Sequence, residues 1–198
     1  MAANARPHHA HPTRLPHSER VLLLVDFINP LDFPGAEQLA APALEAARTT
    51  VRLKSALAAQ GVPAIYANDN YGVWQSDFRS LVSGCVGREG ACGEIARLLC
   101  PQADDLAILK PRHSAFYGTP LELLLAEMGA RELVLCGLAT DMCVQITAAD
   151  AFLREFGCWV PADCTAAESQ DARRASLAYM ETVLKCDVRP AAEAGLRS

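Results

Sequence analysis

Short apolar runs alternate along the chain with longer stretches in which apolar residues recur every three or four positions. The short runs predict β-strands at Val21–Asp26, Ala64–Ala67, Leu106–Leu109, Glu132–Cys136, Trp159–Pro161 and Asp187–Arg189. The longer stretches predict α-helices at Glu37–Gln60, Trp74–Ser83, Gly93–Leu99, Pro120–Met128, Asp141–Phe156 and Glu168–Leu184. Several strand candidates are apolar at every position, which is typical of parallel strands buried on both faces. The alternation predicts an α/β fold with three layers, a parallel sheet with helices on both faces.

Domain boundaries follow from the ends of this pattern. Residues 1–19 are rich in His, Pro and Ala and contain no apolar segment typical of a signal peptide, so we expect a disordered N-terminal tail. Residues 20–198 show no internal repeat and no linker, and their length suits a single domain with one sizeable core. Gly61 and Gly129 mark expected helix ends, and Gly84–Gly93 is expected to be a loop.

Composition narrows the class of protein. Of the 198 residues, 51% are hydrophobic and the formal net charge is −5, so the chain is globular and offers no basic surface for nucleic acid or an acidic membrane. Apolar runs such as Val21–Val25 are too short to span a bilayer. The eight cysteines include no C-x-x-C pair, which favours a cytoplasmic protein with reduced thiols.

Histidine placement limits the chemistry further. Four histidines lie in the expected tail, at His8, His9, His11 and His17, and only His113 lies in the body of the chain. A histidine-rich metal site therefore cannot form inside the fold, and we expect no metal or other cofactor there. The tail histidines would bind a metal only weakly, and His113 is expected to be structural.

Cys143 is the most informative candidate for chemistry. It follows the apolar run Leu133–Cys136 after one tight turn, where Thr140–Asp141 predicts the start of a helix. Backbone N–H groups in a first helical turn lack intrahelical partners, and the helix dipole favours negative charge there. Such a position lowers the pKa of a thiol and makes it a nucleophile. A buried structural cysteine is the alternative interpretation.

Two more polar residues occupy equivalent positions. Asp26 ends the run Val21–Val25, and Lys110 ends the run Leu106–Leu109. In an open parallel sheet the carboxyl ends of the strands share one edge, where ligands bind. Asp26, Lys110 and Cys143 are therefore expected to converge, although each of them singly fits a solvated strand end.

Three segments carry a resemblance to a known family. They are Val25-Asp26-Phe27-Ile28-Asn29, Lys110-Pro111-Arg112-His113-Ser114-Ala115-Phe116-Tyr117 and Gly137-Leu138-Ala139-Thr140-Asp141-Met142-Cys143-Val144. In order and spacing they resemble the isochorismatase-like cysteine hydrolases. The resemblance implies a six-stranded parallel sheet with Rossmann-type strand order and a catalytic triad of Asp26, Lys110 and Cys143. It also implies a cis peptide bond between Leu138 and Ala139 and self-association as a homo-oligomer, a dimer or tetramer.

Thiol chemistry at this site can be outlined from the residue types. Asp26 is the expected base, although moving a proton from an ordinary thiol to an ordinary carboxyl costs about 6 kcal/mol. The helix start and Lys110 must lower the pKa of the thiol, and burial must raise that of Asp26. The thiolate then attacks a carbonyl, and the backbone N–H groups of Ala139 and Cys143 are expected to form the oxyanion hole. Asp26 protonates the leaving amine, and water hydrolyses the thioester.

The substrate pocket is harder to place. Asn29, Trp74, Phe116 and Tyr117 are candidate substrate-binding residues, and Arg112 is expected to be merely exposed. Nicotinamidases of the family hold a metal with an Asp-x-His pattern, whereas this chain has Asn68-Asp69-Asn70 at that place. This difference argues against metal-dependent nicotinamidase activity and favours a loop fixed by side-chain-to-backbone hydrogen bonds.

The sequence therefore predicts a cysteine hydrolase that cleaves the C–N bond of a small amide or imide through a thioester. A non-catalytic binding or scaffold protein and an isochorismatase-type ether hydrolase are the alternatives. A thiol redox protein, with Cys136 resolving an oxidised Cys143, is a further one. A nucleophilic Cys143 is expected to react with iodoacetamide well below about pH 8, faster than the other thiols.

Overall fold

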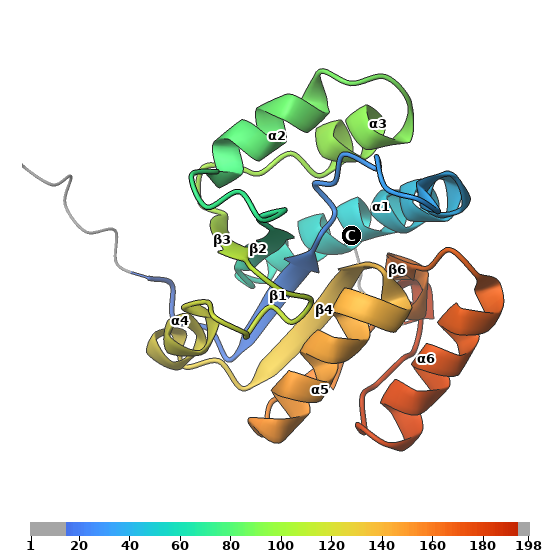
Figure 1. Ribbon diagram of the computed structural model, residues 1–198. Helices are drawn as coiled ribbons and strands as arrows, with labels where there is room; N and C mark the ends of the chain where they lie inside the picture. The colour runs from blue at the N-terminus through green and yellow to red at the C-terminus, as the bar shows by residue number, and fades with distance from the viewer. Residues whose placement is uncertain (1–14, 194–198) are drawn as a thin grey trace, which may run out of the picture.

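The computed structural model describes residues 15–193, which form a parallel β-sheet between two layers of helices (Figure 1). The strands are β1 (Arg20–Val25), β2 (Ala64–Asp69), β3 (Leu106–Lys110), β4 (Glu132–Leu138), β5 (Gly157–Trp159) and β6 (Thr165–Ala166). The helices are α1 (Ala36–Ala59), α2 (Phe78–Val86), α3 (Gly90–Leu98), α4 (Leu121–Met128), α5 (Gln145–Leu153) and α6 (Gln170–Thr182). Three short helical segments complete the list: η1 (Thr140–Val144), η2 (Ala162–Cys164) and η3 (Ala191–Glu193).

The strand order is β3-β2-β1-β4-β5, and every pair of neighbours is parallel. β6 pairs with the end of β4, whereas β5 pairs with its beginning, so both occupy the same edge. The predicted six-stranded parallel sheet with helices on both faces is confirmed.

Burial on both faces explains why β1 is continuously apolar. Val21, Leu23 and Val25 join one core cluster, together with residues of α4, α5 and α6. Leu22 and Leu24 join the other core, with residues of α1 and α3. Each fully buried aliphatic side chain contributes about 1.5–3 kcal/mol, which makes the middle of the sheet a rigid support for the strand ends.

Two predictions from the sequence were wrong: the strand at Asp187–Arg189 and the loop at Gly84–Gly93. Asp187–Arg189 makes only an isolated bridge, between Asp187 and Trp159, and the short strand β6 carried no apolar run long enough to reveal it. Most of Gly84–Gly93 is helical, since it contains the end of α2, one tight turn and the start of α3. Gly93 permits this turn, since a Cβ there would lie 1.8 Å from the carbonyl oxygen of Arg88.

The expected tail falls mainly outside the described residues, which begin at Leu15, so nothing tests residues 1–14. Its last residues belong to the fold: Leu15 packs against the core, and the Ser18 N–H donates to the Met128 carbonyl at 2.9 Å. Among the described helices, none combines the length and apolar character needed to cross a membrane.

Candidate active site

The structure brings Asp26, Lys110 and Cys143 together at the carboxyl edge of the sheet. Asp26 directly follows β1, Lys110 ends β3, and Cys143 lies in η1, just after β4. The Lys110 Nζ atom lies 2.8 Å from Asp26 Oδ2 and 3.5 Å from Cys143 Sγ. Since β2 separates β1 from β3, the lysine reaches Asp26 only because its side chain is long and Lys110 is in register with the end of β2.

Hydrogen bonds fix both charged members. Asp26 Oδ1 accepts the N–H of Asp69 at 2.7 Å, and its other oxygen pairs with Lys110. Lys110 also donates to the carbonyl of Arg112 at 3.2 Å and lies 3.6 Å from a carboxylate oxygen of Asp69. Asp26 adopts the left-handed backbone conformation (φ 51°), which is unusual for a residue other than glycine and marks the sharp end of the strand.

Burial dominates the electrostatics of the site. Lys110 is fully buried, and Asp26 and Cys143 are 4% and 9% exposed. Burial raises the pKa of Asp26, an effect that the Lys110 charge opposes. Burial lowers the pKa of Lys110, but the carboxylate of Asp26 and the sulfur of Cys143 outweigh it, so that pKa rises. The resting site therefore holds an ammonium–carboxylate pair beside the sulfur.

The Cys143 thiol differs from the sequence expectation. Burial and then the negative charge of Asp26 raise its pKa to about 12, and Lys110 only partly offsets them. This direction opposes the low-pKa thiol expected from the sequence, and the faster reaction of Cys143 with iodoacetamide stays a prediction. The sequence showed a helix start and a cation, but it did not show how completely the site would be buried.

The turn between β4 and η1 presents the sulfur and two candidate oxyanion donors. Gly137 lies so close to β1 that a Cβ would be 2.1 Å from the Val25 carbonyl oxygen, and its φ is 149°. The peptide bond between Leu138 and Ala139 is cis. The N–H groups of Met142 and Val144 donate to the Ala139 carbonyl. The expected helix Asp141–Phe156 therefore begins with a π-helical turn that carries Cys143.

Thr140 does not cap the Cys143 N–H group. Its hydroxyl pairs with that of Thr165 at 2.9 Å, and the Thr165 hydroxyl donates to the Gly137 carbonyl at 2.8 Å. These bonds tie β6 to the turn, and they leave the Cys143 N–H without a partner from the Thr140 side chain.

A cavity of ≈ 550 Å³ adjoins the triad. Its wall is formed by the loop after β2 and the loop after β3, with lining residues Asp69, Asn70, Gly72, Trp74, Pro111, Arg112, His113, Tyr117 and Gly118. His113 connects it to the nucleophile, because His113 Nδ1 lies 3.5 Å from Cys143 Sγ. The sequence analysis expected His113 to be structural and Arg112 to be exposed, although both follow Lys110 closely and His113 is the only histidine in the body of the chain.

Of the four expected substrate-binding residues, Trp74 and Tyr117 line this cavity and are 77% and 63% exposed. Phe116 does not line this cavity, and its role in substrate binding stays a prediction. Its ring is buried, packs near Phe156 with ring centroids 6.0 Å apart, and lies under the Arg154 guanidinium. Asn29 instead holds its own turn, accepting the Leu31 N–H at 2.9 Å.

The Asn68-Asp69-Asn70 segment fixes the loop, as expected. Asn68 donates to the Ile28 carbonyl at 2.8 Å, Asp69 accepts the N–H of Tyr71, and Asn70 accepts the N–H of Gly72. Within residues 15–193, no group of three or more His, Cys, Asp or Glu side chains is arranged to hold a metal ion.

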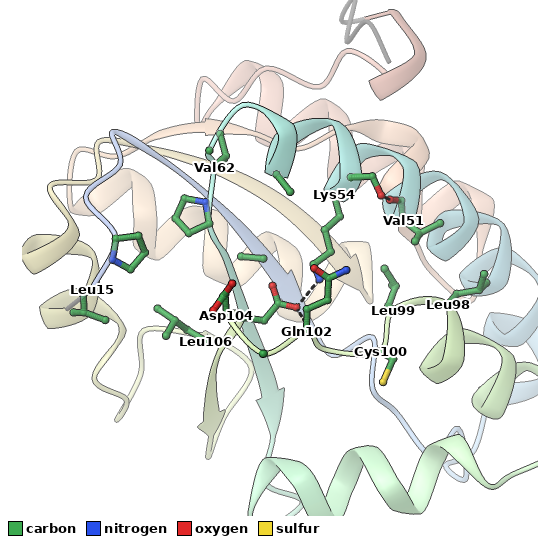
Figure 2. A pocket seen from close by; sticks show the side chains of 18 residues that line it. Leu15, Val51, Lys54, Val62, Leu98, Leu99, Cys100, Gln102, Asp104 and Leu106 are labelled. Atoms are coloured by element: carbon green, nitrogen blue, oxygen red, sulfur yellow. Dashed lines mark hydrogen bonds and ion pairs between the residues drawn. The ribbon is translucent and has the colours of Figure 1, made fainter. Parts of the chain in front are cut away.

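A second cavity, of ≈ 560 Å³, lies where strands β2 and β3 begin, at the opposite ends of the strands from the triad. It is enclosed by α1 and the loop before β3 (Figure 2). Its wall contains the ion pair of Lys54 with Asp105, at 2.5 Å, and both side chains are about nine-tenths buried. Figure 2 shows Lys54 pointing from α1 toward Gln102, with the Cys100 sulfur turned away from that pair. Within the described residues no hydrogen bond joins the Cys100 sulfur to a charged side chain or a histidine, in contrast to the sulfur of Cys143.

Comparison with known proteins is consistent with this geometry. A family model described as the Isochorismatase domain matches residues 20–188. An uncharacterized isochorismatase family protein, YaaI, from Bacillus subtilis is 34% identical over 86% of this chain and 93% of its own length. The ureidoacrylate amidohydrolase RutB from Methylobacterium radiotolerans is 44% identical, over 42% of this chain and 33% of its own.

Among solved structures, N-carbamoylsarcosine amidase from Thermoplasma acidophilum superposes with a TM-score of 0.63 and 27% identity, over 90% of this chain and 99% of that one. The match of the family model, the identity to YaaI over most of both chains and the shared architecture lead to one conclusion. The chain belongs to the isochorismatase family.

Proposed function

We propose that this isochorismatase-family hydrolase cleaves the C–N bond of a small amide through a thioester on Cys143, with Asp26 and Lys110 as its partners. The observation that carries the proposal is the contact of one buried ammonium group with both a carboxylate and a thiol, at 2.8 Å and 3.5 Å. The names of two similar proteins, an amidohydrolase and an amidase, support amide hydrolysis.

In this proposal the thiol proton moves to Asp26 as the sulfur attacks the carbonyl carbon. Deprotonation of Cys143 before the attack would be costly, since a rise in its pKa from 9.0 to about 12 adds about 4 kcal/mol to the free energy of deprotonation. Forming the C–S bond in the same step avoids that cost. The protonated Asp26 then gives the proton to the leaving nitrogen, and the C–N bond breaks. Lys110 keeps Asp26 ionised between turnovers.

Backbone N–H groups of Ala139 and Cys143 are the proposed donors to the oxyanion. One such donor typically accounts for a factor of about 10²–10³ in rate. Trp74, Tyr117 and Arg112 line the entrance, so a planar substrate can stack on the aromatic rings while an anionic group meets the guanidinium. Because two similar proteins are named for ureido and N-carbamoyl compounds, such compounds belong in the first substrate panel beside simple carboxamides.

The experiment is hydrolysis of this amide panel by the wild type, Cys143→Ala and Cys100→Ala. We expect Cys143→Ala to lose turnover while keeping its unfolding transition, and Cys100→Ala, at an exposed thiol, to keep both. Full activity of Cys143→Ala would contradict the proposal and favour the ether-hydrolase alternative.

Self-association as a dimer or tetramer is a prediction from the family resemblance, and sedimentation of the full chain checks it.

The redox alternative gains no support from the position of Cys136. Cys136 belongs to the core on the α1 side of the sheet, whereas Cys143 belongs to the core on the other side. Burial and the neighbouring Cys164 raise the pKa of Cys136 well above its ordinary value. A bond between Cys136 and Cys143 would require one sulfur to cross the sheet.

A further inference from the structure

We propose that His113 is a further catalytic residue, which moves protons in hydrolysis of the thioester from the cavity side of Cys143. The inference rests on the proposed function and adds a second acid–base group to it. Besides Asp26, the sulfur has a neighbour on each side: Lys110 Nζ lies at 3.5 Å, from a fully buried side chain, and His113 Nδ1 lies at 3.5 Å, from an exposed one.

The geometry separates the two halves of the reaction. Asp26 is almost fully buried, and both of its oxygens are engaged, by the Asp69 N–H and by Lys110. Asp26 therefore lies on the buried side of the sulfur, and it is not among the residues that line the cavity. His113 lines this cavity and contacts the Cys143 sulfur, so the proposal brings the water for the second half of the reaction from the cavity. A base for this water is therefore expected on the cavity wall.

His113 suits that task best among the described lining residues. Arg112 cannot accept a proton, and a tyrosine hydroxyl such as that of Tyr117 is a poor base near neutral pH. Asp69 is occupied, because it accepts the Tyr71 N–H and lies 3.6 Å from Lys110. Asn70 and the remaining lining residues carry no basic side chain. An imidazole both accepts and donates protons near neutral pH.

Anchoring of the loop keeps His113 beside the sulfur. The next residue, Ser114, is hydrogen-bonded to Asp150 of α5, and the Ala115 N–H donates to Thr147 Oγ1 at 3.0 Å. The same helix follows the turn that carries Cys143, so the loop and the nucleophile share one support.

The step balances without any further reactant. The oxygen of water attacks the thioester carbonyl carbon, and its proton passes to the His113 imidazole. The tetrahedral intermediate collapses, the C–S bond breaks, and the imidazolium returns the proton to the departing sulfur 3.5 Å away. The products are a free acid and the Cys143 thiol, with His113 neutral again.

p-Nitrophenyl acetate separates the two halves, because the nitrophenolate burst reports acylation of Cys143 and the later steady rate reports hydrolysis of the acetyl-thioester. We expect His113→Gln and His113→Asn to keep the burst and to lose about 10²-fold or more of the steady rate. His17→Gln is the matched control, since this exposed histidine lies near Gly129 and does not line the cavity. It should keep both phases.

Hydroxylamine distinguishes a catalytic role of His113 from a purely structural one. This nucleophile cleaves thioesters without help from a base, so it should restore turnover of His113→Gln far more than it accelerates the wild type. Equal steady rates in wild type and both His113 variants, or equal losses of burst and steady rate, would overturn the role of His113. The absence of a Cys143-dependent burst in the wild type would instead remove the thioester itself and with it the proposed function.

Discussion

At the scale of single residues, Asp26 has two opposed effects on the nucleophile. Its charge raises the pKa of the Cys143 thiol, yet it is the proposed acceptor of the thiol proton. Lys110 acts in the opposite direction on the sulfur, and its charge also opposes the rise that burial causes in the pKa of Asp26. In the proposed mechanism the thiol therefore stays neutral and shielded until a carbonyl is in place to form the C–S bond.

The rate of Cys143 alkylation tests these effects, because loss of the Asp26 charge and loss of the Lys110 charge should change it in opposite directions. Asp26→Asn removes the charge that raises the thiol pKa, so at mildly alkaline pH more thiolate forms and iodoacetamide should modify Cys143 faster than in the wild type. The same variant should be inactive on amides. Lys110→Met removes the opposing charge and should slow alkylation. Slower alkylation of Asp26→Asn, measured by mass spectrometry of the Cys143 peptide, would show that the charges act differently.

Lys110 also affects stability. Removing one member of a buried ion pair typically costs about 3–5 kcal/mol, because the other charge is left unpaired. Lys110→Met should therefore lower the free energy of unfolding by about that amount, whereas Lys185→Met, at an exposed lysine, should change it by less than about 0.5 kcal/mol. Urea unfolding of both variants checks this, and adding Asp26→Leu to Lys110→Met should recover part of the loss. An additive double variant would contradict the pairing.

The convergence of Asp26, Lys110 and Cys143 could be predicted at this scale, because two of them end apolar runs and Cys143 follows a third after one tight turn. His113 and Arg112 could not be placed, since no apolar pattern fixes where the side chains of a loop point. Phe116 shows the same limit in reverse, because an aromatic residue beside a site is equally suited to the core.

At the scale of elements, the turn from β4 into η1 controls the position of the sulfur. Gly137 allows β4 to approach β1, and the hydroxyl chain from Thr140 through Thr165 ties the turn to β6. The sequence predicted a tight turn here but not the π-helical turn, since amphipathic periodicity cannot distinguish one wide turn at the start of a helix.

Gly137→Ala tests this element against Gly157→Ala. A Cβ at Gly137 would lie 2.1 Å from the Val25 carbonyl oxygen at a positive φ, so the turn must shift. We expect a loss of roughly 3 kcal/mol in unfolding free energy and strongly reduced acylation by p-nitrophenyl acetate. At Gly157 the nearest atom would be 3.5 Å away, and both quantities should stay near wild type. Unchanged acylation in Gly137→Ala would mean that the turn does not position Cys143.

At the scale of the whole molecule, the sheet follows from its apolar pattern. The central strands β1, β2 and β4 are buried on both faces, and their continuous apolar runs made them predictable. The edge formed by β5 and β6 is short and only partly apolar, so its pairing depends on tertiary contacts that no local pattern reveals. The convergence of three distant residues follows from the same parallel arrangement.

The most direct test of the central claim is mass spectrometry of the whole chain after brief exposure to p-nitrophenyl acetate, followed by peptide mapping. The account predicts one acetyl group, on the peptide that contains Cys143, formed in the wild type and lost in Cys143→Ala. Acetylation that falls instead on the exposed Cys100, or that persists unchanged in Cys143→Ala, would contradict the account.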